Sequence, residues 1–133
     1  NETNYLEVCS QATDKFMEMM GMDVDFIKIK QESYFTVETH IRHLNEAKEG
    51  MLIIAKTQVL EASGKKLRLF HILETDGGIL VATGEHMLLH VSLKTRASCL
   101  PSKKIAENLD YLYKKHSKLS LPDGAGRSVG YKG

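Results

Sequence analysis

The first 20 residues carry an apolar stripe with the period of an α-helix. Its side chains recur at steps of three and four residues, as Tyr5, Val8, Cys9, Ala12, Phe16, Met19 and Met20. Asn1 or Thr3 can cap the free N–H groups at the start, and Gly21 suits the end of such a helix. The pattern therefore predicts one long amphipathic helix over residues 1–20.

From residue 24 onward, apolar positions alternate with polar ones, which is the pattern of β-strands. The predicted strands cover residues 24–30, 34–44, 51–60, 66–73 and 79–91. The first of them is short and changes its apolar face at Phe26-Ile27, which suggests a bulge. In the second, one face is expected to carry Phe35, Val37, Thr39 and Ile41.

Short turns join the predicted strands. Ala62-Ser63-Gly64 and Asp76-Gly77-Gly78 are turn signals, because glycine accepts a positive φ without strain. Gly84, inside the last strand, predicts a bulge or a close backbone approach. A second helix is expected after Pro101, followed by a loose glycine-rich tail over residues 124–133. Strands joined this way favour an α+β fold, in which an antiparallel sheet wraps around the long helix.

The composition is that of an ordinary globular domain. The 133 residues are 42% hydrophobic and 26% charged, so residues 1–133 are expected to form one domain with one core. The formal charge of +1 gives no overall attraction to nucleic acid or to a membrane. No apolar run reaches the ~20 residues that span a bilayer. Cys9 and Cys99 have neither metal-site nor disulfide spacing, which favours two buried thiols in a reducing cytoplasm.

The polar face of the predicted strand 34–44 is the first candidate for chemistry. It carries Glu38, His40 and Arg42. Glu38 or His40 could serve as a general base or a substrate ligand, although a solvated or interface face is the commoner meaning of this pattern. Basic residues further along the chain, among them Arg68, could meet phosphate groups.

Three histidines, His71, His86 and His90, form a second set. His86 and His90 stand four residues apart in a strand and so lie ~13 Å apart along it, too far to bind one metal ion. Hydrogen-bonded structural histidines are the favoured interpretation, and no metal site is predicted. The chain has no G-x-S-x-G, Walker or G-x-G-x-x-G motif. The N–H groups at the start of the first helix could polarise a carbonyl group or bind an anion.

Several short segments resemble one family. Asn1-Glu2-Thr3-Asn4-Tyr5 is similar to the end of the motif D-x-x-G-H-x-N-x-x-x-Y of hotdog-fold acyl-CoA thioesterases related to 4-hydroxybenzoyl-CoA thioesterase. A narrower branch, which includes betainyl-CoA thioesterases alone or fused to carnitine dehydrogenases, resembles this chain at residues 38–42, 57–60, 66–71, 85–91, 121–122 and 126–127. The resemblance implies a cytoplasmic hotdog thioesterase that forms a dimer or a tetramer. It implies acyl-CoA as the substrate, with no metal and no cofactor apart from the CoA of that substrate.

The resemblance also implies roles for particular residues. The backbone N–H of Glu2 would polarise the thioester carbonyl, and Asn1 would shape the turn beside it. The family's first strand and its catalytic aspartate precede this segment, so both are expected upstream of Asn1. Glu38 and His40 are expected on the far side of the pocket, where a partner subunit could supply them. The substrate is expected to contact Tyr5, Arg42 and Arg68.

Substrate class and activity leave alternatives open. Glu38 could balance the quaternary ammonium of a betainyl-type acyl group, because its charge is opposite. A non-catalytic hotdog module that binds acyl-CoA or mediates assembly is the second hypothesis. A hotdog dehydratase, which typically uses a histidine on the central helix, is disfavoured because residues 1–20 contain none.

Overall fold

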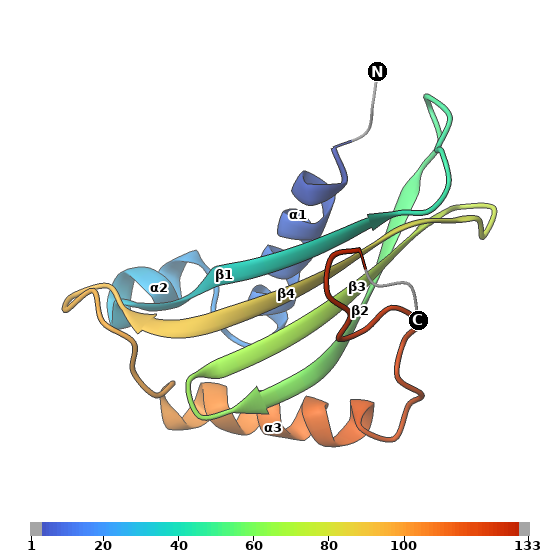
Figure 1. The fold of residues 1–133 in the computed structure, drawn as a ribbon. Helices are drawn as coiled ribbons and strands as arrows, with labels where there is room; N and C mark the ends of the chain where they lie inside the picture. The colour runs from blue at the N-terminus through green and yellow to red at the C-terminus, as the bar shows by residue number, and fades with distance from the viewer. Residues whose placement is uncertain (1–3, 131–133) are drawn as a thin grey trace.

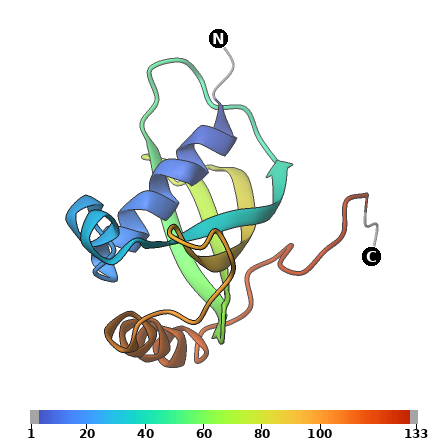
Figure 2. The ribbon, with the colours of Figure 1, turned by 90° about the vertical axis from the view of Figure 1, so that its left-hand side faces the viewer.

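The computed structural model describes residues 4–130 as one antiparallel sheet with three helices (Figure 1). The elements are α1 (Tyr5–Met19), α2 (Val24–Lys30), β1 (Glu32–His43), β2 (Ile53–Ser63), β3 (Lys66–Thr75), β4 (Leu80–Ser92) and α3 (Lys103–His116). The four strands have the order β1-β4-β3-β2. Figure 2 shows α1 on one side of the sheet and the C-terminal segment on the other, which we call the outer face. The predicted α+β class and the sheet around a long helix are confirmed.

Helix α1 has a defined cap at each end. The side chain of Asn4 accepts a hydrogen bond from the Glu7 N–H at 3.1 Å, so Asn4 fills the capping role that the sequence assigned to Asn1 or Thr3. After the helix, the N–H of Met22 reaches back to the Met17 carbonyl at 2.8 Å. That closure needs a left-handed residue, which Gly21 provides with φ +100°. Most of the predicted apolar stripe faces the sheet, but Met19 is 69% exposed and does not join the core.

Residues 24–30 form the helix α2, so the predicted strand there is wrong. Asp23 caps this helix, because its Oδ1 accepts the Phe26 N–H at 2.8 Å. Lys28 and Lys30 lie in the last turn, where positive charge suits the helix dipole. The adjacent apolar pair that suggested a bulge is the inward side of a single short helix.

Strand β1 contains a bulge that the sequence did not predict. Its pairing with β4 shifts between Thr36 and Glu38, which leaves Val37 as the extra residue. Thr39 and Ile41 face α1 as expected, but Phe35 and Val37 are turned to the outer face, where they are 42% and 59% exposed. The four residues expected on one face are therefore divided between two.

The hairpins and the second helix follow the sequence prediction. Gly64 and Gly78 have positive φ angles in the two turns. Helix α3 lies along β2, buries Ile105 and Leu109, and accepts the Val59 N–H on His116 Nδ1 at 2.8 Å. No helix within residues 4–130 has the length and apolarity to cross a bilayer.

Candidate functional site

The start of α1 is where the sequence placed the chemistry. Asn1 and Glu2 lie outside the described residues, which begin at Asn4. Tyr5 is buried in the core beside Cys9 and Leu73, with its ring 5.5 Å from that of His43. In this chain Tyr5 therefore packs α1 against the sheet.

Three of the predicted site residues meet on the outer face. Glu38 on β1, Met87 on β4 and Arg68 on β3 are paired across neighbouring strands, and His40 follows on the same face. With Glu85, Gly126 and Arg127 they line a pocket of about 190 Å³, which we call the outer pocket. The alternation of β1 after its bulge thus brings Glu38 and His40 together as predicted.

Ion pairs and the C-terminal segment complete the outer pocket. Glu85 lies 3.6 Å from Arg68 Nε, and its other oxygen accepts the Gly126 N–H at 2.7 Å. Arg127 bonds Asp123 at 3.0 Å. Arg42, the remaining predicted ligand, is not in this pocket, since its guanidinium donates to the Asp123 carbonyl at 3.1 Å. Opposite charges therefore already face one another in the outer pocket.

The sheet separates the outer pocket from α1. Figure 2 shows the helix and the C-terminal segment on opposite sides of the strands. Glu38 and His40 therefore do not approach the start of α1 within one chain. A second copy would have to bring the two groups together.

The histidines that the sequence singled out are buried and hydrogen-bonded. His71 bridges Thr13 of α1 and Thr57 of β2, with both N···O distances 2.8 Å. Burial, and then the His86 ring 5.3 Å away, lower the pKa of His71 to about 4. His86 bonds Thr39 at 3.2 Å, and burial lowers its pKa as well. His71 thus ties α1 to the sheet as a neutral imidazole, and His86 joins β4 to β1.

His90 is the third of these histidines. Its Nδ1 lies 2.9 Å from the Cys99 carbonyl oxygen, and its Nε2 lies 3.4 Å from Glu32. Glu32 also accepts the Ser102 N–H at 3.2 Å, just before α3. Within residues 4–130, no three His, Cys, Asp or Glu side chains are grouped to hold a metal ion.

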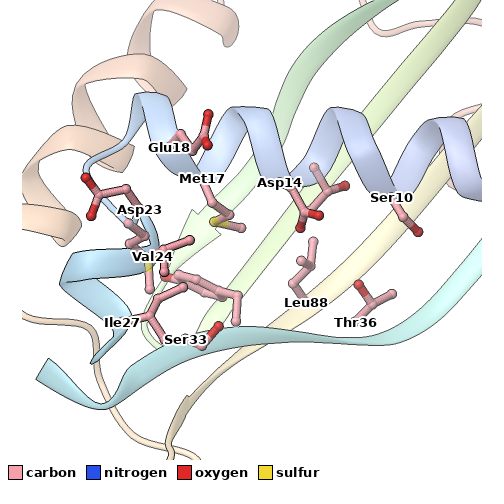
Figure 3. Close-up of a pocket in the computed structure, with 13 residues that line it drawn as sticks. Ser10, Asp14, Met17, Glu18, Asp23, Val24, Ile27, Ser33, Thr36 and Leu88 are labelled. Carbon is pink, nitrogen blue, oxygen red and sulfur yellow. The ribbon is translucent and has the colours of Figure 1, made fainter. Parts of the chain in front are cut away.

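A second hollow lies on the α1 side of the sheet and was not predicted. It has a volume of about 450 Å³ between α1, α2 and β1 (Figure 3), and we call it the acidic groove. Its lining includes Ser10, Asp14, Met17, Glu18, Asp23, Val24, Ile27, Tyr34, Thr36 and Leu88. Figure 3 shows Ser10 and Asp14 projecting from α1 toward β1. The signal in the sequence was their spacing of four residues, which places both on one side of a helix.

Comparison with known proteins places this fold among the hotdog thioesterases. A solved structure of a candidate thioesterase from Pseudomonas putida KT2440 matches with a TM-score of 0.79 and 31% identity, over 97% of this chain and 82% of that one. The model of the thioesterase-like superfamily matches residues 1–109. The chain belongs to this superfamily.

Two curated relatives carry betainyl-CoA thioesterase in their names. The L-carnitine dehydrogenase/betainyl-CoA thioesterase of Ruegeria pomeroyi is 48% identical over 96% of this chain. The chain spans about a quarter, 26%, of that relative's length. The betainyl-CoA thioesterase of Pseudomonas aeruginosa PAO1 is 37% identical over 95% of this chain and 80% of the relative.

Proposed function

We propose that this chain is an acyl-CoA thioesterase domain, which hydrolyses a thioester to a carboxylic acid and free CoA. A betainyl-type acyl group is the proposed substrate. The observation that carries the proposal is the similarity to the P. aeruginosa betainyl-CoA thioesterase, because it covers 95% of this chain and 80% of a protein named for that activity alone.

The start of α1 suits the chemistry of thioester hydrolysis. When water adds to the thioester carbonyl, the oxygen becomes an anion, and N–H groups at a helix start stabilise it. Asn4 sets where α1 begins, and the Thr13–His71 bond holds the helix on the sheet. Glu2, to which the resemblance assigns the polarising N–H, precedes this cap by two residues and lies outside the described part of the chain. Glu38 and His40 of a second copy form the opposite wall.

A panel of acyl-CoAs tests this function through the release of free thiol. We expect the intact protein to hydrolyse betainyl-CoA with a kcat/KM above about 10⁴ M⁻¹ s⁻¹, the lower range of ordinary enzymes. The panel should include acetyl-CoA, butanoyl-CoA and 3,3-dimethylbutanoyl-CoA, which is the neutral isostere of betainyl-CoA. Binding without thiol release from any of them would favour the non-catalytic module instead.

Self-association is the second part of the proposal. β1 is an edge strand of the sheet, with 12 residues and the exposed apolar side chains of Phe35 and Val37. Pairing with another copy would cover such an edge. We expect light scattering to give two or four times the 14.9 kDa mass of the chain. A mass of one chain at micromolar concentration would contradict a site built from two copies.

Because CoA thioesters are the proposed substrates, the cytoplasm is the proposed location.

A further inference from the structure

The acidic groove carries negative charge without matching positive charge. Among the thirteen residues that line it, Asp14, Glu18 and Asp23 are acidic and none is Lys, Arg or His. Glu18 pairs with Lys15 at 3.6 Å, and Asp23 caps α2. Within residues 4–130 the Asp14 carboxylate forms no ion pair and accepts no hydrogen bond. One carboxylate of the groove is therefore available to a ligand.

The remaining walls of the acidic groove are aromatic and apolar. Tyr34 of β1 is 8% exposed and lines the groove together with Leu88 of β4. Val24 and Ile27 close it from α2, as Figure 3 shows. The groove thus joins a free carboxylate to an aromatic ring and an aliphatic surface.

We propose that the acidic groove binds the trimethylammonium head of a betainyl-type acyl group, with Asp14 as its counter-charge. This inference rests on the proposed thioesterase function and names the residues that would set its specificity. A quaternary ammonium has no N–H to donate, so proteins recognise it by nearby negative charge and by aromatic contact. Asp14 and Tyr34 supply these two groups, and the aliphatic walls accept the methyl groups.

The outer pocket is less suited to such a head. Glu38 lies there, but Arg68 and Arg127 line the same pocket and would repel a fixed cation. Glu85 is already in contact with Arg68 and the Gly126 N–H. Glu38 is therefore the competing counter-charge, and the groove is favoured because its lining has no cation.

The length of the acyl group determines whether its carbonyl can reach the start of α1 in the same chain or only that of a second copy. Asp14 follows Asn4 by ten residues, which is about 15 Å along α1 at 1.5 Å per residue. The nitrogen of a betainyl group is only two bonds from its carbonyl carbon. A head held at Asp14 therefore requires the carbonyl to meet the helix start of a second copy. In this arrangement the acidic groove forms the wall opposite that helix start, in place of Glu38 and His40, which lie on the other face of the sheet.

The test compares two substrates of equal shape. We expect Asp14→Asn to lower the ratio of kcat/KM for betainyl-CoA to that for 3,3-dimethylbutanoyl-CoA about tenfold, which corresponds to about 1.4 kcal/mol. Asp25→Asn is the matched control, because it removes the same charge from an exposed aspartate that does not line the groove. If Asp14→Asn left this ratio unchanged, the inference would be overturned. The same holds if the ratio fell in Glu38→Gln and not in Asp14→Asn.

A binding measurement separates this inference from the proposed function. Glycine betaine, the product of the reaction, is titrated into labelled protein while the NMR signals of Asp14 and Tyr34 are followed. We expect saturable shifts at both residues that Asp14→Asn weakens about tenfold. If no acyl-CoA is hydrolysed, the thioesterase proposal fails while these shifts still test the groove. Signals that respond to protein concentration and not to betaine would show that a second copy covers the groove, which would overturn the inference.

Discussion

Replacing Gly84 by alanine is expected to lower the free energy of unfolding by about 3 kcal/mol, at the upper end of the usual cost of overpacking a core. A Cβ at this position would lie 2.5 Å from Cys9 Sγ and 3.1 Å from Ile41 Cδ1. Cys9 is fully buried on α1, so its sulfur has little room to move. Denaturant unfolding of the two proteins measures the loss.

The paired substitution Cys9→Ala identifies the cause of that loss. It removes the sulfur and leaves Cys9 Cβ at 3.5 Å from the new methyl group, an ordinary contact. We therefore expect Gly84→Ala to cost less than about 1.5 kcal/mol in the Cys9→Ala background. Equal costs in both backgrounds would mean that the close approach of α1 and β4 is not the reason for the glycine.

Acidification from pH 7 to pH 4.5 is expected to remove about 2–3 kcal/mol of stability through His71 alone. The pKa of this buried imidazole is about 4 in the folded chain, against an ordinary value of 6.5. As pH falls below 6.5, the unfolded chain takes up a proton that the folded chain does not. Stability is therefore lost between pH 6.5 and pH 4, and His86 acts in the same direction.

The variant His71→Gln separates this effect from the titration of carboxylates. It should be less stable than the parent at pH 7.5, because the bonds to Thr13 and Thr57 are disturbed. It should also lose less stability between pH 7 and pH 4.5, as unfolding midpoints at each pH would reveal. Parallel pH profiles for the two proteins would rule out His71 as the source.

The sequence predicted the elements whose pattern is local and long. The stripe of α1 spans several turns, and the strands alternate over many residues, so both could be recognised without tertiary contacts. The seven residues of α2 are too few for a clear period, and their start depends on the cap at Asp23. The bulge at Val37 could not be predicted, because it is a property of the pairing with β4.

The sequence predicted only that part of the candidate site which depends on local alternation. Glu38 and His40 share a strand face, which alternation alone indicates. The approach of Arg42 to Asp123 joins residues 81 positions apart, and the contact of Gly126 with Glu85 joins residues 41 apart, so neither leaves a local signal. The acidic groove depends on α2, whose residues were predicted to form a strand. An error in one short element thus concealed a whole cavity.

The place of α1 in the chain has a consequence for biosynthesis. The helix is made before the strands of its sheet, and Thr13 bonds His71, which follows 58 residues later. At about 5–20 residues per second, the apolar stripe waits several seconds for β3 and longer for β4. During that interval the helix lacks β3 and β4, which supply part of its contacts in the finished fold, and that part of its apolar face is exposed to chaperones or to other nascent chains. The solubility of the emerging helix is therefore a requirement on this segment, in addition to its packing in the finished domain.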